Sequence, residues 1–186
     1  TLNRYLPYGS VIPSAGDGSI MLPFQKWETR EIDGKKVRVN KTFEEHPEYF
    51  ALNKDGSRNE HYLDLTNPDV LDVTTQYAFD YFEKNPDAIA FPIAPPDGAP
   101  TSAAPASQAL NKFFMQREPA NPQIQDISGS FYWFINELAK RVKQKYPDKL
   151  ITTTAYSGRI RPPENLDLSD NITVHTALLP YSRHHR

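Results

Sequence analysis

An aspartate stands at the point where a buried apolar run of the sequence ends. The run is IAFPIAPPDG, residues 89–98, and the carboxylate is Asp97. A carboxyl group beside apolar residues and prolines can keep its proton and donate it as a general acid. Hydrolysis of a glycosidic bond uses such an acid together with a second carboxyl group that acts as nucleophile or base. The alternative is an Asp-Gly turn in which the carboxylate only caps the backbone.

A second carboxyl group for that reaction does not stand out. The candidates are Asp64, Glu44, Glu45 and Glu48, each of which is also typical of a surface or capping residue. The second group could instead come from a part of the protein outside these residues. A substrate whose own N-acetyl group acts as the nucleophile would need only one acid and an orienting residue. The sequence leaves these alternatives open.

Polar clusters follow two later apolar runs, LITTTAYSGR at 150–159 and ITVHTALLPYSRHH at 172–185. Arginine pairs with a carboxylate or sulfate through two parallel hydrogen bonds, so these clusters suit an acidic sugar. Two histidines are further candidates: His46, which also suits an exposed loop, and His175, which lies within the last run and also suits a buried structural role. The candidate substrate-binding residues are His46, Tyr156, Arg159, His175, Tyr181, Arg183 and His184.

The sequence favours chemistry without a metal or a cofactor. It contains no cysteine, which excludes disulfides, thiolate metal sites and cysteine nucleophiles. His184 and His185 are adjacent, and adjacent residues of a strand point to opposite faces, so the two cannot easily hold one ion. HExxH, Gly-rich phosphate-loop and GxSxG patterns are missing from the sequence. We therefore predict no metal site and no cofactor.

The composition of the chain limits the classes of partner that it is expected to bind. The 186 residues carry a formal net charge of -2, which gives no basic footprint for nucleic acid. No apolar run approaches the ~18 residues of a membrane-spanning helix. The 17 prolines and the 10 Phe, 10 Tyr and 2 Trp residues are typical of long ordered loops over a sheet, although aromatic side chains also serve simply as core.

Three short apolar runs alternate with helical patterns, which indicates a parallel sheet. The carboxyl ends of parallel strands meet at one edge of the sheet, where α/β proteins place their chemistry. Asp97 and the polar clusters are therefore expected to converge on one cleft. The expected strands are 89–94, 150–156 and 172–179, and the expected helices are 67–84, 107–117 and 127–147.

The first third of the chain lacks such periodicity. It contains one hairpin at 29–39, with Asp33-Gly34 as a type I′ turn, and a second turn at Asp55-Gly56. A loop-rich stretch of this length often belongs to an active-site insertion. We predict an α/β fold that is part of a (β/α)8 TIM-barrel-like domain. Residues 1–186 would form a single partial domain, with a loop-rich insertion at 1–60 and βα units of the barrel at 61–186. Because such a barrel takes roughly 250 residues, we expect a fragment of a larger chain.

Several separate blocks carry a family resemblance. They are HPEYFALNKDGSR (46–58), LDLTNPDVLDVTTQYAFDYFEKNPDA (63–88), SFYWFINELAKRVKQKYPDKLITTTAYS (130–157) and the final VH…PYSRHH (174–185). Together they resemble the bacterial family catalogued as domain of unknown function 4838 (DUF4838), over about residues 43–185. The resemblance implies a glycoside-hydrolase-type barrel, similar to those of α-glucuronidases and hexosaminidases. It also implies bacteria that secrete polysaccharide-degrading proteins, and hence an extracellular or periplasmic location.

The function expected from these observations is that of a glycoside-hydrolase-like, carbohydrate-active protein. It would act on a polysaccharide or oligosaccharide by acid/base catalysis, with Asp97 as the acid. The alternative is a non-catalytic glycan-binding or structural module of a larger secreted assembly. The expected partners are a carbohydrate and either the rest of the barrel or an assembly partner; nucleic acid and a membrane span are not expected.

Overall fold

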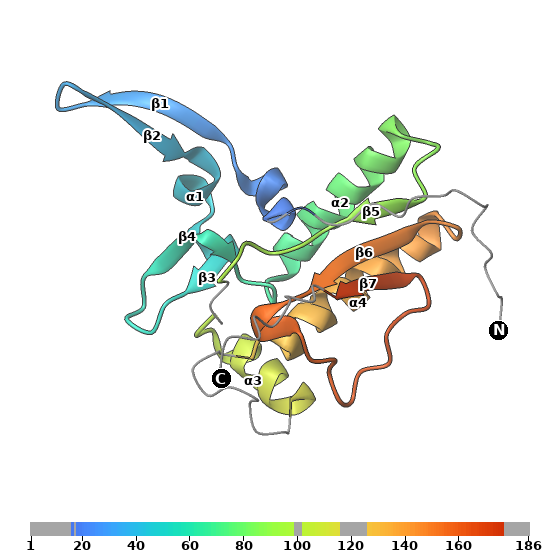
Figure 1. The fold of residues 1–186 in the computed structure, drawn as a ribbon. Helices are drawn as coiled ribbons and strands as arrows, with labels where there is room; N and C mark the ends of the chain where they lie inside the picture. Colours follow the sequence, from blue (N-terminus) through green and yellow to red (C-terminus); the bar gives the residue numbers. More distant parts are fainter. Residues whose placement is uncertain (1–15, 17, 99–101, 116–125, 177–186) are drawn as a thin grey trace, which may run out of the picture.

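The computed structural model describes residues 16, 18–98, 102–115 and 126–176. Its centre is a three-stranded parallel sheet in the order β5-β6-β7, formed by Ala90–Pro92, Leu150–Ala155 and Ile172–Thr176. Two long helices, α2 (Pro68–Lys84) and α4 (Ser128–Lys145), lie against one face of this sheet (Figure 1). The predicted α/β class with a parallel sheet is confirmed. Within the described residues the sheet does not close into a barrel.

The helices begin where the sequence provides caps. The side chain of Asn67 accepts a hydrogen bond of 2.9 Å from the backbone N–H of Asp69, and Pro68 occupies the first helical position of α2. Helix α3 spans Pro105–Phe114 rather than the predicted 107–117. The reason is again a proline: Pro105 needs no backbone partner and takes the first helical position. The prediction had begun this helix too late.

The register of the sheet tells which residues face the helices. Phe91 of β5 lies against Tyr77 and Tyr81 of α2, with ring centroids 6.0 and 5.2 Å away. Phe91 pairs with Ile151, which in turn pairs with Ile172, so these three residues share the helix-covered face. Side chains alternate along a strand, so the next residues face the other way. The helix-free face thus carries Pro92, Thr152, Thr173, Thr154 and His175.

Residues 18–63 contain more regular structure than predicted. The expected hairpin is present, and Asp33 and Gly34 have the positive φ angles, 51° and 71°, of a type I′ turn. A second hairpin is also present, of which the sequence indicated only the turn at Asp55-Gly56. In it residues 50–52 pair with residues 58–63, and the register shifts at a β-bulge. The elements are η1 (Ser19–Phe24), β1 (Trp27–Ile32), β2 (Lys35–Asn40), α1 (Lys41–Glu45), η2 (Pro47–Tyr49), β3 (Phe50–Leu52) and β4 (Arg58–Leu63).

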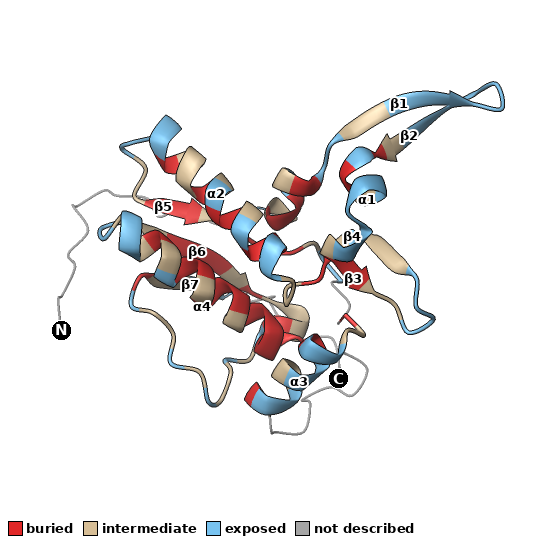
Figure 2. Ribbon diagram, turned by 180° about the vertical axis from the view of Figure 1, so that it is seen from behind, coloured by how far each residue is buried: buried red, intermediate tan, exposed pale blue. Residues whose placement is uncertain are grey.

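The hydrophobic core lies between the sheet and the two long helices. Figure 2 shows buried residues along β5, β6 and the inner sides of α2 and α4, while the β1–β2 hairpin projects away and is largely exposed. Helix α4 supplies the most buried side chains, which follow its apolar stripe. Those that are almost completely inaccessible to solvent include Phe131, Phe134, Ile135, Leu138 and Val142.

The connection from β6 to β7 contains a 3₁₀ helix, η3 (Ser157–Arg159), and a loop, but no α-helix. Buried Asn136 of α4 ties this loop to the core: its Nδ2 donates to the carbonyl of Asp167 at 3.3 Å, and its Oδ1 accepts from the backbone N–H of Ser169 at 2.8 Å. Asn171 adds a hydrogen bond of 2.9 Å to the carbonyl of Ala139. Side-chain amides therefore hold the loop where a helix would otherwise pack. Among the helices described, none has the length and apolar character needed to cross a bilayer.

Candidate functional site

Asp97 lies five residues beyond Pro92, the last residue of β5. The last ladder hydrogen bond joins the backbone N–H of Ile93 to the carbonyl of Thr152 at 2.9 Å, and two prolines then lead the chain away from the sheet. The hydroxyl of Tyr62, from β4, donates to the backbone carbonyl of Asp97 at 3.1 Å. This bond fixes the backbone and leaves the carboxylate exposed. An exposed carboxylate on a fixed backbone can reach a bound substrate.

The chain segment before β1 supports the same strand end. The hydroxyl of Ser19 accepts a hydrogen bond of 2.8 Å from the backbone N–H of Ala94, and the N–H of Ile20 donates to the carbonyl of Ala94 at 3.0 Å. The N–H of Gly18 donates to the carbonyl of Pro95 at 3.3 Å. These contacts position the Pro-Pro-Asp segment from its other side, although the residues are far apart in sequence.

Arg159 and Tyr156 follow β6 at the same edge of the sheet. Arg159 is only 3% exposed, and its Nε donates to the carbonyl of Thr154 at 3.0 Å. Its guanidinium lies 5.7 Å from the ring centroid of Phe131 and 6.0 Å from that of Tyr156. A cation over two aromatic rings is stabilised by their π faces. In the structure Arg159 is buried and its Nε hydrogen bond holds the strand end; its role in substrate binding stays a prediction.

Burial at the carboxyl end of β6 also changes the pKa of Tyr132, a residue of α4. Tyr132 is 2% exposed, and its hydroxyl donates to the backbone carbonyl of Arg159 at 3.1 Å. Desolvation raises the pKa of Tyr132 to about 12, against a smaller lowering influence of the Arg159 charge. Tyr132 therefore stays protonated and remains a hydrogen-bond donor.

The remaining candidates that the structure describes, His175 and His46, lie in two different elements. His175 lies on the helix-free face of β7, paired in register with Thr154, and is half-buried. His46 lies at the start of η2, where its Nδ1 is 3.0 Å from a carboxylate oxygen of Glu48 and its ring stacks on Tyr49 at 4.6 Å. Both contacts are with residues of its own segment. Tyr181, Arg183 and His184 lie outside the described residues.

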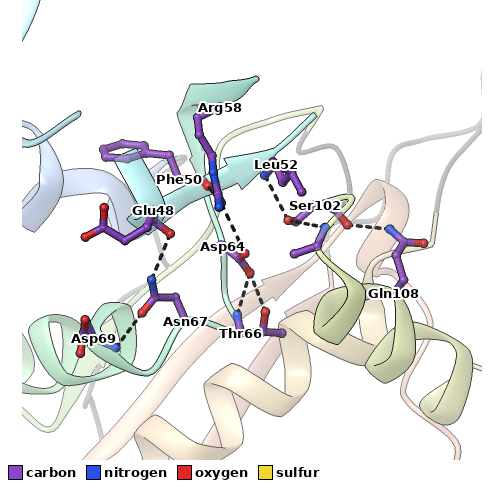
Figure 3. A network of polar contacts seen from close by, with 11 residues as sticks. Glu48, Phe50, Leu52, Arg58, Asp64, Thr66, Asn67, Asp69, Ser102 and Gln108 are labelled. Atoms are coloured by element: carbon purple, nitrogen blue, oxygen red, sulfur yellow. Dashed lines mark hydrogen bonds and ion pairs between the residues drawn. The ribbon is translucent and has the colours of Figure 1, made fainter. Parts of the chain in front are cut away.

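The carboxylates considered as partners for Asp97 have structural contacts of their own. Asp64 is 6% exposed and accepts from the hydroxyl of Thr66 at 2.6 Å and from its backbone N–H at 3.1 Å, while Arg58 lies 3.7 Å away (Figure 3). These contacts stabilise the turn that connects β4 to α2. The exposed carboxylates pair with neighbours: Glu44 with Arg30, Glu45 with Lys41, and Glu48 with His46.

A pocket that the sequence did not reveal opens beside Asp97. It is small and open to solvent, with a cavity volume of about 30 Å³, and it lies where the carboxyl end of β5 meets the first turns of α3 and α4. Its serines come from the segments GAPTSAAPAS (98–107) and ISGS (127–130). The small residues of these two segments are the sequence feature that could have indicated a pocket. The lining residues are Ile20, Tyr62, Leu63, Leu65, Pro95, Pro96, Ser102, Ser107, Ile127 and Ser130.

Ser102 builds one wall of this pocket. Its hydroxyl accepts hydrogen bonds of 3.2 Å from the backbone N–H groups of Leu52 and Ala104, and its carbonyl accepts one of 2.6 Å from Gln108 (Figure 3). The N–H of Ala103 donates to the carbonyl of Leu52 at 2.7 Å. The start of α3 is thereby attached to β3, which gives the pocket a fixed wall.

The described residues provide no centre for a metal ion, since no three His, Asp or Glu side chains among them gather in the way that a metal site requires. The fold and the site define an α/β protein with polar residues and a pocket at the carboxyl ends of parallel strands. The family model "Domain of unknown function (DUF4838)" matches residues 25–186, and the chain belongs to that family. No curated protein matches the chain.

Proposed function

We propose that this chain forms part of a (β/α)8 barrel and acts as a glycoside-hydrolase-like, carbohydrate-active protein, outside the cytoplasm. Three parallel strands lie side by side in their sequence order, with α2 and α4 on one face and a largely polar row, including Thr154 and His175, on the other. A barrel has the same arrangement, with its helices outside and its active site at the carboxyl ends of the strands. The observation that carries the proposal is the exposed carboxylate of Asp97 at that end, beside the pocket.

In the proposed reaction Asp97 protonates the glycosidic oxygen, the bond from this oxygen to the sugar carbon breaks, and water adds to that carbon. Asp97 recovers its proton from this water in a retaining or substrate-assisted reaction; in an inverting reaction the second carboxylate takes the water's proton and Asp97 is reprotonated from solvent. The hydroxyl of Tyr62 keeps the Asp97 backbone in place through its bond to the carbonyl. The second carboxyl group would come from the remainder of the barrel, or the substrate's N-acetyl group would replace it.

Asp97→Asn is the variant that tests this role. Its matched control is Asp87→Asn, in the exposed turn between α2 and β5. Both proteins are incubated with a panel of uronic-acid and N-acetylated glycans, and released sugars are measured by mass spectrometry. We expect turnover by the wild type and by Asp87→Asn, and a loss of about 10²–10⁴-fold in Asp97→Asn, as for a missing general acid. Equal turnover by all three proteins would remove Asp97 from the reaction.

A non-catalytic glycan-binding module is the second candidate. It is favoured by the structural contacts of Asp64, Glu44, Glu45 and Glu48, which leave no second carboxylate assigned beside Asp97 within the described residues. In this case no glycan is cleaved, but one is retained on an affinity gel by the wild type and by Asp97→Asn alike.

A further inference from the structure

A serine at the end of the middle strand of the sheet has a strained backbone. Ser157 lies two residues beyond Ala155, the last residue of β6, and its φ angle is 51°. A Cβ atom makes such a left-handed conformation unfavourable, whereas glycine adopts it freely. Four glycines among the described residues have a positive φ, but Gly158, the neighbour of Ser157, is not one of them. The strain therefore falls on a serine although a glycine is the next residue.

The turn that contains Ser157 is held in place by α4 and the residue before it. The backbone N–H of Ile127 donates to the carbonyl of Gly158 at 2.7 Å, and the hydroxyl of Tyr132 donates to the carbonyl of Arg159 at 3.1 Å. Both bonds use backbone carbonyls, so they hold the turn without using the hydroxyl of Ser157. A strained residue persists only where surrounding contacts over-determine its conformation, and such residues cluster at functional sites.

The other non-glycine residue with a positive φ in the described part of the chain has an evident structural role. Asp33, whose φ is also 51°, lies in the type I′ turn of the β1–β2 hairpin, which requires a positive φ at both central positions. Ser157 instead begins η3, in the connection between two parallel strands. A hairpin turn therefore does not account for its conformation, and the presence of a side chain there has another reason.

The position of Ser157 supplies that reason. Because β5 and β6 are parallel neighbours, the segments that follow them meet at one edge of the sheet. Both segments border the small pocket: Pro96, which precedes Asp97, lines it, and so does Ile127, whose N–H is bonded to Gly158. Ser157 is half-buried, so its side chain is accessible at this edge. Its hydroxyl is thus held at the same end of the sheet as the carboxylate of Asp97.

We propose that Ser157 is a carbohydrate-binding residue of this site, and that its hydroxyl exchanges hydrogen bonds with a hydroxyl group of a sugar. The inference rests on the proposed function, since that function makes a sugar the ligand. A serine hydroxyl donates one hydrogen bond and accepts others, as each hydroxyl of a sugar does. The anchored turn fixes the serine before the ligand arrives, which reduces the cost of ordering it on binding. The left-handed φ then belongs to a side chain that serves the ligand rather than the fold.

Ser157→Gly separates a role in binding from a role in the fold. Glycine removes both the strain and the hydroxyl, so the melting temperature should rise by about 1–4 °C while binding weakens. Ser157→Ala keeps the Cβ atom and removes the hydroxyl alone. Asp33→Gly is the matched control, because it relieves the same φ in a hairpin that projects away from the sheet. Binding is measured with the full chain by electrophoresis in gels that contain xylan, glycol chitin or polygalacturonate.

We expect at least one of these polysaccharides to slow the migration of the wild type and of Asp33→Gly equally. Both Ser157 variants should bind about three- to tenfold more weakly, as for one lost hydrogen bond. Binding of none of the three polysaccharides, unchanged binding by the Ser157 variants, or an equal loss in Asp33→Gly would overturn the proposal. So would a lower melting temperature of Ser157→Gly, because the fold would then need the serine side chain. The gels detect binding without turnover, so Ser157-dependent binding with no sugar released would reject only the catalytic proposal.

Discussion

Helices α3 and α4 approach each other at a glycine, which makes Gly129→Ala a sharp test of their packing. A Cβ atom at this position would lie 2.7 Å from the Cα of Asn111, 2.7 Å from the carbonyl oxygen of Leu110 and 3.1 Å from the N of Asn111. Non-bonded carbon atoms are comfortable at about 3.5–4.0 Å, so the helices would have to separate by on the order of 1 Å. All three atoms belong to the backbone of α3, and no side-chain rotation relieves the clash.

The expected change in the free energy of unfolding of Gly129→Ala follows from two opposing effects. Added volume at a close contact costs about 1–3 kcal/mol, and a rigid backbone neighbour places this case at the upper end. Alanine is favoured over glycine inside a helix by about 1 kcal/mol, which offsets part of that cost. We therefore expect Gly129→Ala to lower the free energy of unfolding by about 2 kcal/mol. With a urea m value of about 2 kcal/mol per molar, the midpoint falls by about 1 M.

The assay is urea unfolding followed by circular dichroism. Gln144→Ala, at an exposed position of the same helix, serves as the control and should change the stability by less than about 0.5 kcal/mol. The hydrogen bond of 2.7 Å between the N–H of Ser130 and the side chain of Asn111 should weaken as the helices separate. A Gly129→Ala protein as stable as the wild type, or more stable, would refute the close contact described here.

Two further predictions concern helix capping and pH. Asn67→Ala removes the cap of α2 and should cost about 1 kcal/mol in the same urea assay; no loss would show that the Asn67–Asp69 bond is not formed in solution. Because the folded-state pKa of Tyr132 is raised to about 12 from 10.0, its contribution to stability is fully present below pH 10 and is lost as the pH rises to 12. The loss is about 3 kcal/mol, since one pKa unit corresponds to ~1.4 kcal/mol. Tyr132→Phe should lose less stability than the wild type between these pH values, and equal losses would contradict a buried Tyr132 hydroxyl.

The predictions that succeeded rest on local signals. Asn67-Pro68 marks a helix start by hydrogen bonding and by a fixed φ angle, both properties of the residues themselves. Asp33-Gly34 specifies a type I′ turn because both positions tolerate a positive φ. The alternation of apolar runs with helices predicted the parallel sheet, whose pairing the structure confirms.

Features that depend on contacts between distant residues could not be predicted. The strand 50–52 is too short to show alternation, and it forms because residues 58–63 pair with it across a bulge. The sequence did not show that Arg159 is buried with its guanidinium over the rings of Phe131 and Tyr156; its predicted role in substrate binding stays a prediction. The pocket exists because the starts of α3 and α4 meet β5, and only Gly129, with no Cβ, permits the close approach of the two helices.

The projecting β1–β2 hairpin offers a natural place for a reporter group. An isolated two-stranded ribbon is marginally stable, so this hairpin should exchange its amide hydrogens long before the central sheet does. Its turn at Asp33-Gly34 is far from the hydrogen bonds that hold β5, β6 and β7 together (Figure 1). A fluorophore attached at the turn would therefore sense a large glycan or protein arriving at that end of the molecule, while the sheet and its pocket stay undisturbed.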